Sequence, residues 1–415
     1  MTVEHEGQAP SPSACPHFPF ADRPGISMDQ EYLGLFRDEP LVPVQLANGQ
    51  QALLVTRYAD VTTVLSDPRF SREAWRSGTL FARESSALAL ATSDAPTHTR
   101  RRRAVQAWFT HRRAEQARPR IAAIAERLLD GVEAAGSPVD LIADFTTPLP
   151  YRVICELLGV PVADLDRLLP RVTVMMSAGR FPADDVAAAH QAMYDYFFDQ
   201  LAARRRAVDG GAGGDDLLTA LLTAPEQTRL SVEEMAVFGF GLMMAGGETT
   251  ASHLAMAVLQ VLRRPRLAES LRRDPARIPA AVEELLRWVW FAGTGGQPHV
   301  TVAEVELAGT TIGKDQVVIP LTDAANRDPA AFADPDGFRP DRTPNPHLGF
   351  GHGRHMCLGA AHARVELQEG LAAILRRIDR LELAVPEAQL DWRSQMFIRG
   401  VWTLPVRWRR DEAGA

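Results

Sequence analysis

The feature that most constrains the fold is a long apolar segment, residues 231–264. Ser231 and Glu234 form a capping-box pattern, which marks a helix start, and Pro265 follows the segment directly. A helix of this length extends roughly 50 Å at 1.5 Å per residue, enough to cross a whole domain. Its apolar residues occupy nearly every face, as in Met235, Phe238, Phe240, Leu242, Met243 and Leu254. We therefore expect this helix to be buried at the centre of the protein.

The rest of the chain predicts a mainly α fold with a small β portion. Residues 51–63 indicate a strand followed by a helix. Further helices are expected at 100–109, 114–135, 185–208, 280–288 and 359–376, and short strands at 300–307, 317–320, 381–385 and 402–406. Residues 209–216 (DGGAGGDD) predict a flexible surface loop. The chain has no internal repeat and no recognisable linker. We therefore expect a single domain at residues 21–415, preceded by a loose arm at residues 1–20.

Composition excludes several classes of protein. Apolar residues make up 46% of the 415 residues, which is enough for a sizeable core, and no stretch has the pattern of a signal peptide or a membrane span. A net charge of −7 gives no reason to expect a nucleic-acid partner. Cys15, Cys155 and Cys357 lie far apart, which argues against a disulfide framework. We expect a cytoplasmic protein with no membrane partner.

One cysteine stands in a glycine-rich loop. Gly351, Gly353 and Gly359 surround Cys357, just before a helical stretch. Glycine lets the backbone approach a flat ligand closely, and a helix start favours thiolate over thiol, whose ordinary pKa is about 8.5. A lone thiolate cannot build an iron–sulfur site, but one is sufficient for a haem iron. Two alternatives remain on sequence alone: zinc bound by His352, His355 and Cys357, or a plain core cysteine.

The middle of the long helix is also unusual. Ala245-Gly-Gly-Glu248-Thr249-Thr250 places two glycines and an acid where a buried helix is expected. Each glycine costs about 1 kcal/mol relative to alanine, and an unpaired buried acid costs more. Either the segment forms a functional groove, or the helix is kinked here and the glutamate is solvated.

These two segments resemble a known family. Residues 350–359 (FGHGRHMCLG) look like the cysteine-ligand signature of the cytochrome P-450 family, and the resemblance extends from about residue 40 to 408. It implies the P-450 fold, with haem b held by Cys357 in a loop that includes Phe350, Gly351 and Gly359. It also implies a monooxygenase that takes electrons, ultimately from NAD(P)H, through a ferredoxin and its reductase. By the same resemblance Thr249 hydrogen-bonds the bound oxygen, and Glu248 feeds in protons from solvent.

The resemblance also assigns partners for the haem propionates. His98 and Arg102 are similar to the family's His-x-x-x-Arg pair, and His355 matches another propionate position. The family's usual arginine before the small sheet is replaced here by His299. That departure leaves one propionate facing a group with a pKa near 6.5 instead of a permanent charge.

Two charged groups have both a structural and a functional interpretation. Glu284 and Arg287 form an ordinary i, i+3 pair on sequence alone, whereas the resemblance joins them to Arg342 as a brace behind the cysteine loop. A second group is either a solvated face or a docking site for an acidic ferredoxin: Arg100, Arg101, Arg103, Arg112 and Arg113.

Family analogy places substrate contacts in segments rich in Trp, Phe and Met, at residues 75–90, 175–181, 243–248, 289–296 and 396–398. Trp75, Ala245, Val289 and Phe397 are the candidates within them. This composition predicts a small apolar or aromatic specialised metabolite. Residues 342–346 and 383–393 have a weaker resemblance to members that act on cyclic dipeptides, some of which couple aromatic carbons without inserting oxygen. Coupling or dehydrogenation is therefore one alternative, and a non-catalytic haem sensor or carrier is another.

Overall fold

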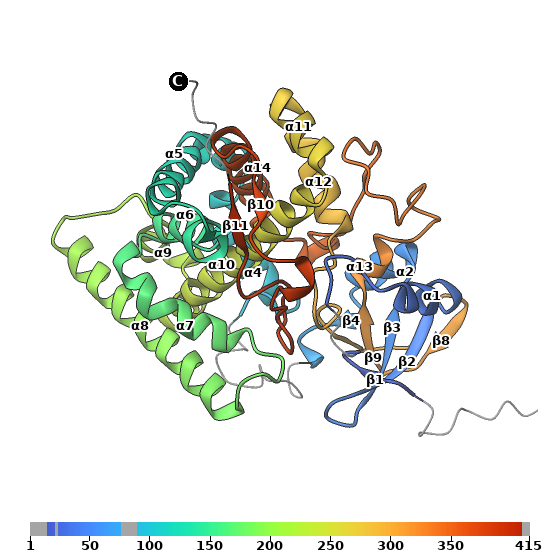
Figure 1. Cartoon of the computed structure of the whole chain (residues 1–415). Coiled ribbons are helices and arrows are strands. Elements are labelled where there is room, and N and C mark those ends of the chain that lie inside the picture. Colours follow the sequence, from blue (N-terminus) through green and yellow to red (C-terminus); the bar gives the residue numbers. More distant parts are fainter. Residues whose placement is uncertain (1–14, 21–23, 76–88, 409–415) are drawn as a thin grey trace, which may run out of the picture.

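Helix α10 (Val232–Leu262) runs unbroken through the middle of the protein, as the sequence predicts (Figure 1). The computed structural model describes residues 15–20, 24–75 and 89–408. Ser231 Oγ accepts a hydrogen bond from Glu234 N at 3.1 Å, and Ser231 N donates to Glu234 Oε2 at 3.0 Å. The capping box is therefore present, and it satisfies two N–H groups that a helix start would otherwise leave without partners.

The other helices surround α10 or cover the sheet. Their bounds are α1 (Gln30–Asp38), α2 (Tyr58–Ser66), α4 (Thr97–Val105), α5 (His111–Ala135), α6 (Pro148–Leu158), α7 (Leu165–Met175), α8 (Ala183–Asp209), α9 (Leu217–Thr223), α11 (Pro265–Arg273), α12 (Ile278–Trp288), α13 (Thr322–Ala325) and α14 (Ala360–Arg377). The predicted helix at 100–109 is divided, because a 3-10 turn, η3 (Gln106–Trp108), follows α4. Within the described ranges no helix is long and apolar enough to span a bilayer.

The β portion is divided: its largest sheet lies to one side of most of the helices, whereas β10 and β11 lie among the helices (Figure 1). Its largest sheet has the strand order β1-β2-β3-β9-β6-β4, and the two smaller sheets have the orders β10-β11-β5 and β7-β8. The strands are β1 (His17–Phe18), β2 (Leu41–Leu46), β3 (Gln51–Val55), β4 (Phe70–Ser71), β5 (Val139–Asp140), β6 (His299–Thr301), β7 (Val305–Leu307), β8 (Thr310–Ile312), β9 (Val317–Pro320), β10 (Glu382–Leu383) and β11 (Pro405–Arg407). The strand predicted at 300–307 is in fact two strands in different sheets.

Two expectations about irregular segments are wrong in part. The arm predicted at residues 1–20 includes β1, which pairs in parallel with β2 and buries Phe18; residues 1–14 lie outside the described ranges. In the loop predicted at 209–216, Asp216 is not a free surface residue. Its carboxylate accepts from Thr219 N at 3.0 Å, which caps α9, and forms an ion pair with Arg204 at 3.2 Å.

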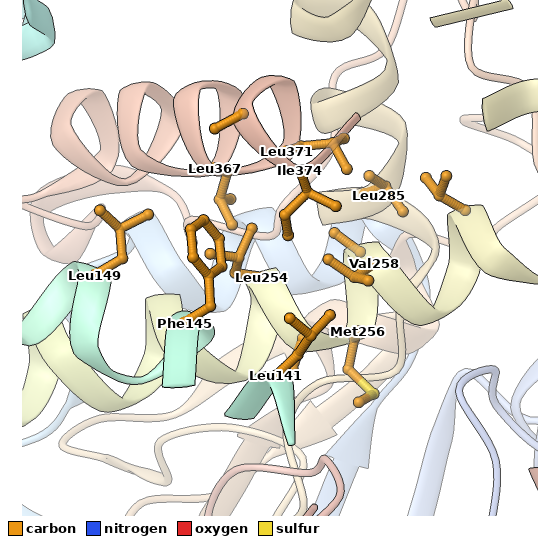
Figure 2. Packing of buried hydrophobic residues seen from close by; sticks show 14 of the residues in the cluster. Leu141, Phe145, Leu149, Leu254, Met256, Val258, Leu285, Leu367, Leu371 and Ile374 are labelled. Carbon is orange, nitrogen blue, oxygen red and sulfur yellow. The ribbon is translucent and has the colours of Figure 1, made fainter. Parts of the chain in front are cut away.

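The main hydrophobic core forms where α5, α6, α12 and α14 pack around the C-terminal half of α10 (Figure 2). Leu254 and Val258 of α10 face Leu149 from α6 and Leu371 from α14, and all four side chains are buried. Each such aliphatic side chain contributes about 1.5–3 kcal/mol when removed from water. This packing fixes α10 relative to α14, and therefore relative to the cysteine loop that immediately precedes α14.

Candidate active site

The central part of α10 faces the cysteine loop across two adjoining cavities. One, of about 230 Å³, is bounded by α6, α10 and α14. The other, of about 340 Å³, is bounded by α4, α8 and α10. Ala245 of α10 lines both cavities, and so do His355 and Cys357 of the loop. Together the cavities form a slot between the helix and the cysteine.

The cysteine loop is closed by its own backbone. Cys357 N donates to Phe350 O at 2.8 Å, and Gly351 N donates to Leu348 O at 2.8 Å. Gly351 and Gly353 have φ values of 70° and 66°, in the left-handed region that favours glycine. A Cβ on Gly353 would also lie 2.5 Å from the carbonyl oxygen of Leu65 in α2. The loop therefore requires glycine at 353, as its sequence suggested.

Opposing effects act on the protonation of the sulfur. Enclosure in the slot raises the pKa of Cys357 above its ordinary value, whereas the Gly359 N–H and then Arg102 and Arg364 lower it. A coordinated metal ion deprotonates a thiol outright. Within the described ranges, no three His, Cys, Asp or Glu side chains converge as metal ligands, so the zinc alternative has no support. Because Cys357 is exposed on the cavity walls, it is not a core cysteine either.

Behind the loop, Glu284 and Arg287 are both fully buried, so they are not a surface pair. Arg287 Nη2 donates to Glu284 Oε1 at 2.7 Å, and Arg342 Nε donates to Glu284 Oε2 at 3.0 Å. Arg287 Nη1 also donates to the backbone oxygen of Asn326 at 2.8 Å, and Asn326 Oδ1 accepts from Leu348 N at 2.7 Å. The brace thus reaches the cysteine loop through Asn326.

On the helix side of the slot, Thr249 and Glu248 are placed differently. Thr249 lines the smaller cavity, and its hydroxyl donates to the Ala245 carbonyl at 2.6 Å. Glu248 is buried and lines neither cavity. Its carboxylate accepts from the Tyr151 hydroxyl at 3.2 Å and forms an ion pair with Arg393. The alternative of a kinked helix with a solvated glutamate is wrong, because Glu248 is buried and ion-paired with Arg393.

The two glycines of this segment serve helix packing. A Cβ on Gly247 would lie 2.4 Å from the ring of Tyr151, and one on Gly246 would lie 3.1 Å from Ile154. Both neighbours belong to α6, which packs closely on α10 at this point. The two glycines destabilise the isolated helix but allow α6 and α10 to pack closely. The same close packing brings the Tyr151 hydroxyl to Glu248.

At one end of the larger cavity, basic side chains gather. His98 and Arg102 come from α4, His355 from the cysteine loop, and Arg72 from the residue after β4. The rings of His98 and His355 have centroids 4.2 Å apart, and the Nε2 atom of each is buried without a hydrogen-bond partner. Burial lowers the pKa of His98 to about 4, with Arg102 and then Arg72 adding to the effect. The sequence missed Arg72.

With this geometry in place, comparison with known proteins identifies the family. The family model described as Cytochrome P-450 matches residues 181–392. Mycinamicin IV hydroxylase/epoxidase from Micromonospora griseorubida is 43% identical over 394 residues, which are 94% of this chain and 98% of that protein. The chain belongs to the cytochrome P-450 family. Nocardicin C N-oxygenase from Nocardia uniformis is 38% identical, over 94% of this P-450 and 98% of that protein.

The fold of this P-450 agrees with solved members. The structure of the mixed-function P-450 MycG superposes with a TM-score of 0.84 at 41% identity, covering 95% of this chain and 100% of that one. The expected mainly helical P-450 fold, with its long distal helix and cysteine loop, is therefore confirmed, and so is the chain's assignment as a haem-dependent monooxygenase of secondary metabolism.

The slot of this P-450 fits haem on structural grounds. It has one cysteine sulfur on its wall, a glycine-containing loop closed beside that sulfur, and two arginines with unpartnered imidazole nitrogens at one end. Buried polar atoms rarely lack partners in proteins, so the orphaned Nε2 atoms of His98 and His355 indicate a missing acceptor such as a carboxylate. The Cβ-free Gly351 and Gly353 allow the tight turn that brings Cys357 to the slot.

The candidate substrate residues of this P-450 do not share one place. Ala245 lines both cavities of the slot, whereas Trp75 and Phe397 line a third cavity of about 220 Å³ beside the sheet. Val289 is buried in the main core and lines none of these three. Leu90 and Met244, from the expected segments at 75–90 and 243–248, line the larger cavity. His190 and Phe240, which were not expected to contact substrate, line it too. Residues 76–88 of the first segment lie outside the described ranges.

Three of the expected substrate segments nevertheless lie side by side. Ser177 bridges to Met396, and Ala292 bridges to Ile398. Gly293 N donates to Phe397 O at 2.9 Å, so residues 175–181, 289–296 and 396–398 form one wall. A Cβ on Gly293 would lie 2.2 Å from the carbonyl oxygen of Met396, which explains the glycine there.

The arginine face is only partly available for a partner. Arg100 and Arg101 both form ion pairs with Glu234, the capping residue of α10. Arg103, Arg112 and Arg113 are exposed, and Arg113 lies over the ring of Trp108 at 4.6 Å. The first two arginines therefore have a structural role, and the other three remain as a basic surface.

Proposed function

We propose that this P-450 oxidises a small apolar or aromatic specialised metabolite held between α10 and the cysteine loop. The observation that carries the proposal is the larger cavity, whose walls are mostly apolar and which reaches Cys357. Concave apolar sites with a few polar groups are typical of small-molecule binding. Haem b, which Cys357 would hold, would supply dioxygen activation when bound, and a thiolate ligand favours that chemistry.

The chain's own residues would then control protons. Thr249 presents a hydroxyl at the cavity wall, and this hydroxyl now donates to the Ala245 carbonyl. Glu248, the next residue towards the N-terminus, is held by Tyr151 and Arg393 on the far side of the helix. Proton delivery by Glu248 would require its carboxylate to leave these partners and approach the slot. Proton transfer by positioned groups of this kind is typically worth about 10²–10⁴-fold in rate.

Electrons would come from NAD(P)H through a ferredoxin reductase and a ferredoxin. The basic surface of Arg103, Arg112 and Arg113 offers a docking site for an acidic carrier of this kind. The three cysteines at positions 15, 155 and 357 are unpaired, which fits the reducing cytoplasm proposed for this enzyme.

Three measurements test this function. Ferric protein is titrated with macrolide cores, terpenes, fatty acids and tryptophan-containing cyclic dipeptides, and a low-to-high-spin shift identifies the class that displaces water. Product mass then separates oxygen insertion, which adds one oxygen, from oxidative coupling, which removes two hydrogens per bond. Cys357→Ser should abolish the thiolate-type spectrum of the reduced carbon monoxide complex. If that spectrum persists, the assigned ligand is wrong; if NADPH is consumed without product, the sensor alternative gains support.

A further inference from the structure

The position where this chain departs from the family pattern has an unexpected neighbour. His299 begins β6, and β6 pairs antiparallel with β4, with Ser71 opposite Val300. Arg72, the residue after β4, therefore lies beside His299. Its Nε–H donates to His299 Nε2 at 3.1 Å. A ring nitrogen that accepts this bond has no proton of its own, so His299 acts here as a neutral acceptor.

Arg72 has no counter-ion within the described ranges. Among the described residues, its only other side-chain hydrogen bond is from Nη1 to the Ala91 carbonyl, at 3.4 Å. The carboxylate of Asp94, which is close enough to affect Arg72, accepts instead from the Ser71 hydroxyl and from the backbone N–H groups of Arg72 and Glu73. Burial lowers the pKa of Arg72 to about 10, with Asp94 partly opposing the effect. A guanidinium enclosed in this way without an anion is costly, which indicates that an anion belongs beside it.

The second, independent observation is the set of groups that face the same space. Arg72, Arg102, His98 and His355 line one end of the larger cavity. The Nε2 atoms of His98 and His355 are buried and have no hydrogen-bond partner among the residues that the structure describes. Two cations and two unused imidazole nitrogens around one cavity end match a ligand that carries carboxylates.

We infer that Arg72 binds a haem propionate, the role that the family pattern gives to an arginine at the position of His299. His299 positions Arg72 by accepting a hydrogen bond from its Nε–H. The inference rests on the proposed haem enzyme and adds a cofactor-binding residue to it. The family pattern has a permanently charged arginine on β6. In this chain the arginine is instead the residue that follows the neighbouring strand, β4. The propionate therefore meets a guanidinium and not a titrating imidazole, and the imidazole keeps the guanidinium turned towards the cavity.

The test is haem retention, measured as the rate at which haem passes from the holoenzyme to excess apomyoglobin. Arg72→Gln should release haem about 10- to 100-fold faster, because it loses a charge-assisted hydrogen bond. Arg69→Gln is the matched control: Arg69 lies three residues away and is half-exposed beside Asp67, so its release rate should equal that of the unaltered protein. Adding His299→Arg to Arg72→Gln should restore slow release, because a guanidinium returns on the neighbouring strand.

The reduction potential of the haem provides a second test, which applies if the Arg72→Gln variant retains its haem. Loss of a positive charge near the cofactor should lower the ferric/ferrous reduction potential of Arg72→Gln, whereas Arg72→Lys should stay closer to the unaltered protein. Equal haem release and equal potential in Arg72→Gln and the unaltered protein would overturn the inference alone. Unaltered protein that binds no haem would overturn the proposed function and this inference together. Thermal melting of each apoprotein separates loss of the cofactor contact from loss of folding.

Discussion

Glu248, the acid in the middle of α10, forms a buried ion pair with Arg393 of the C-terminal loop. Arg393 also lies over the ring of Trp402 at 4.8 Å, and Arg393 N donates to the Gly400 carbonyl at 2.9 Å. The same loop carries Met396 and Ile398, which bridge to the other substrate-wall segments. The helix acid is therefore anchored directly on the segment that the substrate is expected to touch.

This pair should be important for stability. Arg393→Ala leaves the Glu248 carboxylate buried with only the Tyr151 hydroxyl, and breaking a buried ion pair in this way typically costs about 3–5 kcal/mol. Replacing both residues, as in Glu248→Gln with Arg393→Ala, should cost less than Arg393→Ala alone, because no unpaired charge is left buried. Urea unfolding of the two single variants and the double variant measures the coupling. Strictly additive effects would show that the two side chains do not interact.

Thr249 and Thr250 should differ in function although they are adjacent. Both residues line the smaller cavity, but Thr250 is buried, whereas Thr249 is partly exposed and its hydroxyl donates to the Ala245 carbonyl. Thr249→Ala should keep NADPH consumption but divert electrons to peroxide, lowering product per NADPH by about 10²-fold, the lower end of what positioned proton transfer contributes. Thr250→Val is the control and should keep the original coupling ratio. The measurement is peroxide and product per NADPH; equal coupling in both variants would remove Thr249 from proton delivery.

Glu284 should be the most sensitive acid in the brace. Glu284→Gln removes the charge that compensates Arg287 and Arg342 in a site with no solvent exposure, so we expect a loss of about 3–5 kcal/mol in unfolding free energy. Glu382→Gln removes an exposed ion pair with Arg407 and should change stability by less than about 1 kcal/mol. Thermal and urea unfolding of the two variants provide the comparison. A small effect of Glu284→Gln would contradict the buried network.

Glu366 of α14 should make stability depend on pH. Its pKa is raised well above the ordinary value by burial, and Oε2 has no hydrogen-bond partner in the described structure. The folded protein therefore keeps a proton that the unfolded chain releases. This contribution is complete below the ordinary pKa of 4.5 and declines as the pH rises towards the raised value.

Glu366→Gln removes that dependence. Relative to the unaltered protein, the variant should gain stability between pH 5 and pH 8, as measured by urea midpoints at each pH. His362, one turn earlier, has a pKa lowered by burial and remains in both proteins, so its own pH effect cancels in the comparison. Parallel stability profiles would indicate that Glu366 is ionised in the folded protein.

Local sequence determined the parts of this protein that depend on neighbours in the chain. The capping box at Ser231 and Glu234, the strand at 317–320 and the glycine turns before Cys357 all follow from short-range backbone preferences. The cysteine loop indicated a haem ligand because a lone thiolate among glycines suits few other cofactors. The family resemblance then supplied roles for His98, Arg102 and Thr249 that spacing alone left open.

Tertiary structure decided which distant groups share an environment. Arg72 and His299 are 227 positions apart, and Glu248 and Arg393 are 145 apart, so no local pattern could pair them. Arg100 and Arg101 looked like a solvated or docking face until folding placed Glu234 beside them. The physical reason is that charge balance and desolvation depend on distance in space, whereas capping and turn geometry depend on distance along the chain.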